Sequence, residues 1–170
     1  RVFDDLSREL ERYYDEGLAF EFGPKVDGIR DFVISAEGIK AKFPFVIALA
    51  AAAPPLPRWK IIKFRQRREL FADVVYEGVR AKIDETKFSI EPDGDKPGII
   101  FYYDAYDESQ RNAFVGATFI YLDNFIGEFD VATKVGFVDI KPASDPSQLT
   151  RLPLSDLPAT FDKFVAIRSN

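Results

Sequence analysis

The chain has 170 residues, of which 46% are hydrophobic and 15% aromatic, and its formal net charge is −5. This length and apolar content suit one globular domain, residues 1–170, that is large enough to bury a core. The absence of cysteine and histidine excludes disulfides, thiolate or imidazole metal sites, and catalysis by a serine or cysteine paired with histidine. Carboxylate, lysine, tyrosine and serine chemistry remain.

The first part of the chain predicts a helix, a hairpin and a second helix. Residues 2–16 carry apolar side chains at helical spacing among charged ones, which is typical of an amphipathic surface helix within residues 1–18. Two short strands follow, and Asp27-Gly28 between them is a hairpin signal. A helix is predicted over 37–53, in which Pro44 either introduces a kink or begins the main part.

The remaining chain predicts an antiparallel meander, a long helix, a last strand and a closing helix. Residues 59–66 alternate as a strand with Ile62 and Phe64 on one face and Lys63 and Arg65 on the other. The long helix covers about 109–127 and takes Asp107 or Ser109 as its cap. The other predicted elements are strands over 73–82, 86–91, 99–106 and 135–140, turns at Asp84-Glu85 and over 92–98, and a helix over 155–167.

This order of elements predicts an α+β fold. We expect a two-layer sandwich of ferredoxin-like character, with a mainly antiparallel sheet and helices on one face. The apolar run at 43–54 is shorter than the about 20 residues that span a bilayer, so we interpret it as a buried helix. The lack of cysteine and of a visible targeting segment favours a cytoplasmic protein. Because the chain opens at Arg1 and contains no methionine, we expect that an N-terminal segment precedes it.

The basic strand at 58–68 is the sharpest feature of the sequence. It contains six basic residues, two aromatic residues and no acid, whereas the rest of the chain has a charge balance of −11. We interpret its residues Trp59, Lys63, Arg65 and Arg67 as a binding surface for another protein. The alternatives are an edge strand protected by its charges, a stripe paired with the acidic first helix, or a nucleic-acid surface, which the low pI of about 4.9 opposes.

Three carboxylates near the end of the long helix form an alternative acidic site: Asp123, Glu128 and Asp130. Paired carboxylates can hold Mg²⁺ or Ca²⁺, or act as general acid and base. In the structural alternative, Gly127 closes the helix in a left-handed conformation, and Glu128 and Asp130 are loop residues that cap backbone amides. No calcium-loop or glycine-rich phosphate motif is present, so the sequence indicates no metal, no cofactor and no catalytic residue.

Three stretches of the sequence resemble an uncharacterised bacterial family, a domain of unknown function. They are "DFVISAEGIKAKFPFVIALAAAAPPLPRWKIIKFRQRR", "FIYLDNFIGEFDVATKVGFVDIKP" and "LPLSDLPATFD", and the resemblance covers about residues 20–163. It implies a bacterial, cytoplasmic protein and provides no catalytic residue to carry over. The architecture is also similar to that of small acidic regulators that inhibit a ribonuclease by binding it, which is an analogy of fold alone.

The sequence does not establish a function. The leading hypothesis is a non-catalytic binding or regulatory domain that acts through protein contacts. A carboxylate-based metal binder or enzyme is the alternative, and a nucleic-acid binder that uses the basic strand 58–68 is the second alternative. We expect another protein as the partner rather than nucleic acid or a membrane, and the oligomeric state stays open.

Overall fold

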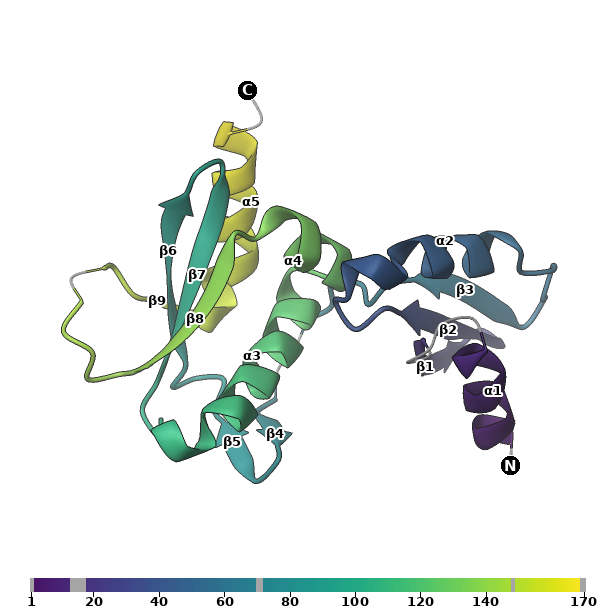
Figure 1. Ribbon diagram of the computed structural model, residues 1–170, viewed down its shortest axis with the longest axis horizontal. Helices are drawn as coiled ribbons and strands as arrows, with labels where there is room; N and C mark the ends of the chain where they lie inside the picture. The colour runs from purple at the N-terminus through teal and green to yellow at the C-terminus, as the bar shows by residue number, and fades with distance from the viewer. Residues whose placement is uncertain (1, 13–17, 70–71, 148, 169–170) are drawn as a thin grey trace. The chain divides into compact units, whose positions relative to one another are not determined.

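The computed structural model describes residues 2–12, 18–69, 72–147 and 149–168, with the side chain of Val2 outside the description (Figure 1). The chain divides into two compact units, Arg1–Gln66 (unit 1) and Arg67–Asn170 (unit 2), and each is described by itself. Both combine helices with a sheet, and antiparallel strand pairs outnumber parallel ones. The predicted α+β class is confirmed. The expectation of one globular domain over residues 1–170 stays a prediction.

The described residues of unit 1 form a three-stranded sheet and two α-helices. Its strands lie in the order β1-β2-β3, with β1 and β2 antiparallel and β2 and β3 parallel. The elements are α1 (Val2–Glu11), β1 (Ala19–Val26), β2 (Ile29–Ser35), η1 (Lys40–Lys42), α2 (Phe43–Ala51) and β3 (Trp59–Lys63). Figure 1 shows α1 and α2 on opposite sides of this sheet.

The first hairpin confirms the predicted turn. Asp27 and Gly28 both have positive φ, 48° and 82°, as the two-residue turn between antiparallel strands requires. Pro44 lies in the first turn of α2 and therefore begins the main helix, since its missing N–H has no helical partner there. The predicted helix over 2–16 is present over Val2–Glu11, and residues 13–17 lie outside the described part.

The predicted strand over 59–66 is shorter than expected. β3 ends at Lys63 because Phe64 adopts a φ of 61°, which an extended strand does not allow. This turn directs the Phe64 ring onto Phe43 of α2, with 4.7 Å between the ring centroids. The predicted alternation of Phe64 with Ile62 and of Arg65 with Lys63 is therefore wrong beyond Lys63.

In unit 2, the residues that the structure describes form a four-stranded sheet, a small hairpin and three α-helices. The sheet has the order β8-β7-β6-β9, in which only β7 and β8 run parallel. The elements are β4 (Val74–Tyr76), β5 (Val79–Ala81), β6 (Lys87–Asp93), β7 (Lys96–Tyr103), η2 (Glu108–Gln110), α3 (Arg111–Phe125), α4 (Glu128–Lys134), β8 (Phe137–Pro142), β9 (Leu152–Pro153), η3 (Leu154–Asp156) and α5 (Leu157–Arg168).

Most predicted elements of unit 2 are present, and one is split. The single strand expected over 73–82 is the hairpin β4–β5, because Glu77 and Gly78 take positive φ values of 45° and 83° and reverse the chain. Asp107 caps the helical segment as predicted, since its carboxylate accepts a hydrogen bond of 2.9 Å from the backbone N–H of Ser109. The closing helix over 155–167 is present as η3 and α5.

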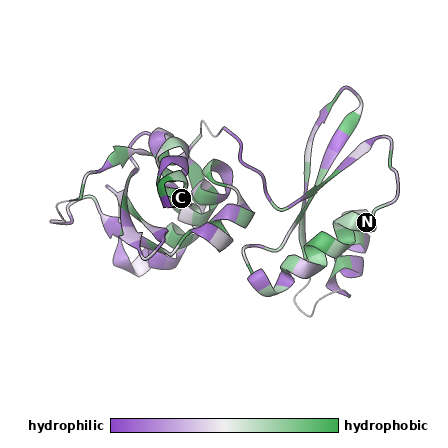
Figure 2. Cartoon of the chain, turned by 90° about the horizontal axis from the view of Figure 1, so that it is seen from above, coloured by the Kyte–Doolittle hydropathy of each residue, from purple (hydrophilic) through white to green (hydrophobic). Residues whose placement is uncertain are grey.

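The core of unit 2 lies between one face of its sheet and its helices. Aromatic side chains fill it, and each of the following is at most 3% exposed: Phe88, Phe101, Tyr103, Phe114, Tyr121 and Phe161. Figure 2 shows hydrophobic and hydrophilic residues mixed along the helices, as expected for helices with one buried face. On the other face of the sheet, the guanidinium of Arg151 lies over the ring of Tyr102, 4.0 Å from the ring centre, and covers it.

The two units share one topological motif. In each, an antiparallel hairpin is followed by a helical connection to a strand that is parallel and adjacent to the second hairpin strand. The motif is β1-β2-α2-β3 in unit 1 and β6-β7-α3-α4-β8 in unit 2. The same backbone motif therefore occurs twice, and the two copies differ in the side chains that they carry.

Candidate functional site

Unit 1 carries a cluster of aromatic rings on one face of its sheet, which we call the aromatic face: Phe3, Phe20, Phe22, Phe32 and Trp59. The strand register explains it, because Phe22 and Phe32 are direct partners across β1 and β2 and therefore point to the same side. Ring centroids lie 5.6 Å apart between Phe22 and Phe32 and 5.4 Å apart between Phe22 and Trp59.

Helix α1 covers only part of the aromatic face. Its Phe3 ring lies 4.6 Å from the ring of Phe20, measured between centroids. Three rings remain accessible: Phe3 is 57% exposed, Phe22 39% and Trp59 38%. Phe3 belongs to α1, and Phe22 and Trp59 belong to the sheet. A group of adjacent exposed rings is typical of a surface that binds another molecule, since burying such rings on association is strongly favourable.

Basic side chains continue this face at the turn end of the sheet. Lys25 is the direct strand partner of Arg30, and Arg30 is the partner of Trp59 on β3, so the three side chains form one row. On β2 and β3, Arg30 and Trp59 are two residues from Phe32 and Ile61 and therefore share their side of the sheet. On β1, Lys25 is three residues from Phe22, and a register shift between them leaves Lys25 paired with Arg30. Arg58 lies beside the row, and together with Gly28 these residues line a hollow of about 300 Å³.

The cations of this row have no acidic counterpart within the described residues. Within residues 2–12, 18–69, 72–147 and 149–168, no carboxylate forms an ion pair with Lys25, Arg30 or Arg58. Like charges directly opposite each other on neighbouring strands destabilise a sheet. The arrangement of Lys25 and Arg30 therefore costs folding free energy and creates a positive potential beside Trp59.

Three of the four predicted binding residues lie in unit 1. Trp59 and Lys63 are on the same side of β3, since both are an even number of residues from Ile61. Arg65 follows the strand and forms an ion pair with Glu21 of β1. The structure therefore brings Trp59 and Lys63 to the aromatic side of the sheet, whereas the Arg65 guanidinium is bound to a carboxylate within the unit.

Arg67, the fourth predicted binding residue, belongs to unit 2 and binds groups of that unit. Its guanidinium donates hydrogen bonds of 2.8 and 2.9 Å to the Asp162 carboxylate and one of 2.5 Å to the Ile126 carbonyl. A further bond of 3.2 Å reaches Asp130. These bonds join α4 and α5, so the side chain has a structural role in unit 2.

The acidic residues of the alternative site are also placed differently from the prediction. Gly127 ends α3 with a φ of 92°, as expected for a glycine. Glu128 and Asp130, however, are in the first turn of α4, so the expectation that they are loop residues is wrong. Asp130 accepts a bond from Arg67 and forms an ion pair of 3.0 Å with Lys134. Glu128 is buried and Asp123 is half-buried on α3.

A metal centre at these acids has no support in the described part of the chain. Within residues 2–12, 18–69, 72–147 and 149–168, no group of three or more carboxylates lies close enough together to hold a metal ion. Asp123, Glu128 and Asp130 thus do not form such a group. General acid–base chemistry at these residues stays a prediction.

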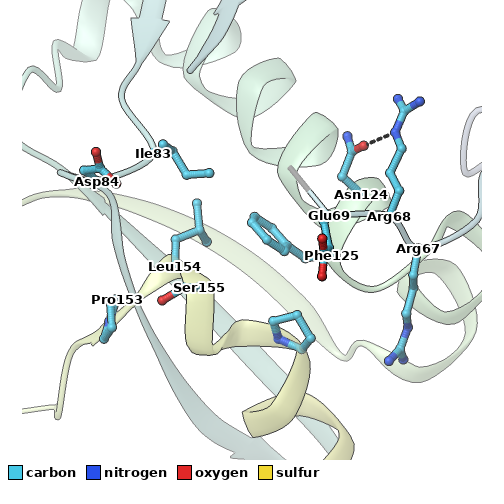
Figure 3. Close-up of a pocket in the computed structure, with 11 residues that line it drawn as sticks. Arg67, Arg68, Glu69, Ile83, Asp84, Asn124, Phe125, Pro153, Leu154 and Ser155 are labelled. Atoms are coloured by element: carbon cyan, nitrogen blue, oxygen red, sulfur yellow. Dashed lines mark hydrogen bonds between the residues drawn. The ribbon is translucent and has the colours of Figure 1, made fainter. Parts of the chain in front are cut away.

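Unit 2 has a hollow of about 680 Å³ between the end of α3, the loop after β5, and the start of α5. Figure 3 shows Ile83, Phe125 and Leu154 around its apolar part, with Arg68 at its border. The Arg68 Nε–H donates a hydrogen bond to the side-chain oxygen of Asn124, and its backbone N–H donates one of 2.8 Å to the Asn124 carbonyl. At this part of the border, the Arg68 and Asn124 side chains are therefore bound to each other within the unit.

Two tyrosines in the core of unit 2 have altered acidity. Burial raises the pKa of Tyr121 to about 12 and raises that of Tyr103 as well. Their hydroxyl groups bind within the core, at 2.7 Å from the Ala81 carbonyl and 2.7 Å from the Thr118 hydroxyl, respectively. Both pKa values move upward from 10.0, further from neutrality, so these tyrosines are stable hydrogen-bonding groups rather than acids or bases for catalysis near pH 7.

Sequence reasoning missed Lys25 and Arg30. A signal for them was present, because the two-residue turn at Asp27-Gly28 places Val26 opposite Ile29 and Lys25 opposite Arg30. The pairing of β2 with β3, which adds Trp59 to this row, depends on the crossover through α2 and has no short-range signal.

None of the described helices is long and apolar enough to cross a membrane. No protein-family model matches the chain, and comparison with curated proteins and with solved structures gave no match either.

Proposed function

We propose that this protein is a non-catalytic binding or regulatory domain that acts through contact with another protein, with the aromatic face of unit 1 as its contact surface. The observation that carries the proposal is the exposure of Phe3, Phe22 and Trp59 side by side on one sheet face. Exposed aromatic side chains supply much of the binding free energy in protein interfaces, and tryptophan is among the residues most enriched at their energetic centres.

The rings of this surface are held by their strands and by one another, which favours affinity. Phe22, Phe32 and Trp59 each belong to a strand, and each ring contacts the other two, with centroid distances of 5.4 to 6.3 Å. A partner that covers these rings therefore loses little free energy in ordering them. The expected partner is a protein segment with apolar side chains for the rings.

Two other functions compete with this proposal. A carboxylate enzyme or metal binder relies on Asp123, Glu128 and Asp130, and Asp130 is already paired with Arg67 and Lys134. A nucleic-acid binder would use the basic strand 58–68, in which Arg65 and Arg67 are bound to carboxylates of their own units. The net charge of −5 also opposes association with a polyanion. A cytoplasmic bacterial setting, which the resemblance implies, would make the partner a cytoplasmic protein.

The test begins with chemical crosslinking in cells of the source organism, followed by affinity purification and mass spectrometry to identify the partner. Binding of the purified partner is then measured for the wild type, for Trp59→Ala and for Phe119→Ala. Phe119 is an aromatic control in unit 2 with a similar exposure of 44%. We expect Trp59→Ala to weaken binding by about 30-fold or more, which corresponds to about 2 kcal/mol, and Phe119→Ala to leave it unchanged.

Equal affinities of the wild type and Trp59→Ala would show that the contact surface lies elsewhere. A partner that binds both variants less tightly by the same factor would also contradict the proposal, because the effect would not be specific to the aromatic face. Circular dichroism of each variant checks that the fold is retained.

A further inference from the structure

We infer that the row of Lys25, Arg30 and Trp59, with Arg58 beside it, is a recognition site for an acidic segment of the partner in which carboxylates flank an apolar side chain. This inference rests on the proposed function and specifies the chemistry of the partner. We call the four residues the basic–aromatic site.

The register of the sheet produces this site. Lys25 stands opposite Arg30, and Arg30 stands beside Trp59, so two cations and an indole ring share one face. Arg58 precedes β3, and its carbonyl accepts a hydrogen bond of 2.9 Å from the Arg30 backbone N–H. That bond fixes the backbone beneath the Arg30 and Arg58 side chains, so both cations border the same hollow.

The positive charges of the basic–aromatic site favour binding of an anion. Among the described residues none supplies a carboxylate to Lys25, Arg30 or Arg58, although the whole chain has 28 acidic and 23 basic residues. Two acids lie close along the chain: Asp27 is in the exposed turn, and Asp31 directly follows Arg30 on β2 and therefore points to the other face of the sheet. Neither forms an ion pair with the three cations within the described residues. A ligand carboxylate placed between Lys25 and Arg30 would convert their repulsion into two charge-assisted hydrogen bonds.

The size and the shape of the site limit what the anion is attached to. The hollow has about 300 Å³ and opens at Gly28, where the space within 4 Å of an added Cβ is empty. It is large enough for one or two side chains rather than for a folded domain. Trp59 supplies a flat apolar wall, so an aliphatic or aromatic side chain next to the carboxylate packs against the indole.

An acidic protein segment fits these features better than a nucleic acid does. The four residues lie at one end of an otherwise apolar aromatic face, where an extended peptide presents carboxylates to the cations and apolar side chains to Phe22 and Trp59. A polynucleotide instead needs a continuous basic path, and Arg65 is already paired with Glu21. The negative net charge of the chain repels a long polyanion as well.

The experiment uses Trp59 as its own reporter, since it is the single tryptophan of the chain. Intrinsic fluorescence of the full chain is titrated with a capped octapeptide of sequence EEFEELEE, with the same peptide in which glutamine replaces every glutamate, and with an octa-uridylate. We expect a saturable change in emission with the acidic peptide alone. Binding weakens as the salt concentration rises, because part of the attraction is between exposed charges.

A matched pair of variants tests the cations. Lys25→Glu places a carboxylate opposite Arg30 and fills the anion position from within the chain, so peptide affinity falls by about tenfold or more. Lys60→Glu makes the same change in net charge on the other face of β3, because Lys60 is one residue from Trp59. The affinity of the Lys60→Glu protein for the acidic peptide stays within about twofold of that of the wild type.

Several results would overturn the inference: no change in Trp59 emission with the acidic peptide, equal binding of the glutamine peptide, or equal losses in Lys25→Glu and Lys60→Glu. Tighter binding of octa-uridylate than of the acidic peptide would assign the site to nucleic acid instead. If the identified partner still depends on Trp59 while the acidic peptide does not bind, the proposed function stands and this inference fails. If the peptide binds and the partner binds the wild type and Trp59→Ala equally well, the proposed function fails and this inference stands.

Discussion

The three-stranded sheet of unit 1 and the four-stranded sheet of unit 2 share one strand motif and differ in what covers them. In unit 2, helices α3, α4 and α5 and the loop around Arg151 cover the sheet, and its aromatic residues Phe88 and Phe101 are fully buried. In unit 1, α1 contacts only part of the aromatic face, and Phe22 and Trp59 stay 39% and 38% exposed.

This comparison teaches that a shared topology does not determine a shared use. A buried aromatic ring stabilises its own fold, whereas an exposed ring adds to the free energy of an association. The same contrast holds for charges, because Arg67 in unit 2 is bound to two carboxylates while Lys25 and Arg30 in unit 1 face each other. We therefore expect substitutions in unit 2 to change stability and substitutions on the aromatic face to change binding.

The largest expected effect comes from the core of unit 2. Phe101→Ala should lower the free energy of unfolding by about 3–5 kcal/mol, because the ring is completely buried in the core cluster. Phe22→Ala in unit 1 should cost about 1–2 kcal/mol, since its ring is only partly buried. Urea denaturation followed by circular dichroism measures both. Equal losses for the two variants would contradict the contrast between the sheets.

The same denaturation experiment tests the expectation of one domain. Trp59 fluorescence reports on unit 1, and near-ultraviolet circular dichroism receives contributions from the buried tyrosines of unit 2. A single domain predicts one shared midpoint for the two signals and an equal shift of both in Phe101→Ala. Separate midpoints, together with an unchanged midpoint of the Trp59 fluorescence in Phe101→Ala, would show that each unit has its own stability.

The next largest loss of stability is expected at a close contact in unit 2, between Gly116 and Tyr76. A Cβ at Gly116 of α3 would lie 2.2 Å from a ring carbon of Tyr76, so the β4–β5 hairpin rests directly on the helix backbone. Gly116→Ala should destabilise the protein by about 1–3 kcal/mol through this overlap, although alanine is the better helix former. Gly116→Ala combined with Tyr76→Ala is the control, and it should recover part of the loss. A stabilised Gly116→Ala protein would contradict the contact.

Alkaline pH should destabilise the protein through the buried Tyr121 of unit 2. The raised pKa of Tyr121 means that its neutral form is favoured in the folded state, so its contribution is complete below the unfolded pKa of 10.0. It is lost as the pH rises from 10 toward about 12, because the unfolded chain releases the proton first. Thermal melts across this range should show a falling Tm, with a weaker decline in Tyr121→Phe. An identical decline in both proteins would exclude Tyr121 as the cause.

The smallest stability effect is expected at the basic–aromatic site, with the opposite sign. Lys25→Glu should raise the free energy of unfolding by about 0.2–1 kcal/mol, because it replaces a cross-strand repulsion with an attraction to Arg30. Urea denaturation at low and high salt measures this gain, which salt should reduce. A loss of stability would mean that Lys25 already has a favourable electrostatic environment in the free protein.

Local signals predicted much of the fold. The Asp27-Gly28 turn, the Asp107 cap and the end of a helix at Gly127 each depend on a few neighbouring residues, and all three are confirmed. Glu77-Gly78 was missed because the turn interrupts an apolar run that alternates on both sides of it. The resumption of helix at Glu128 was missed because Gly127 was interpreted as the end of all helical structure.

The candidate site was predicted only in part. Trp59 was identified from the concentration of basic and aromatic residues, and it is indeed on an exposed face. The ion pairs of Arg65 and Arg67 were out of reach, because Glu21 and Asp162 are far from them in the sequence. Lys25 and Arg30 follow from hairpin register, but their position beside Trp59 requires the parallel pairing of β2 with β3.

The most direct test of the contrast between the two sheets is oxidative footprinting of the full chain, read by mass spectrometry, with and without the identified partner. Our account predicts rapid labelling of Phe22 and Trp59 in the free protein, slow labelling of Phe88 and Phe101, and protection of Phe22 and Trp59 in the complex. Slow labelling of Trp59 in the free protein, or unchanged labelling when the partner is bound, would contradict the assignment of the aromatic face as the contact surface.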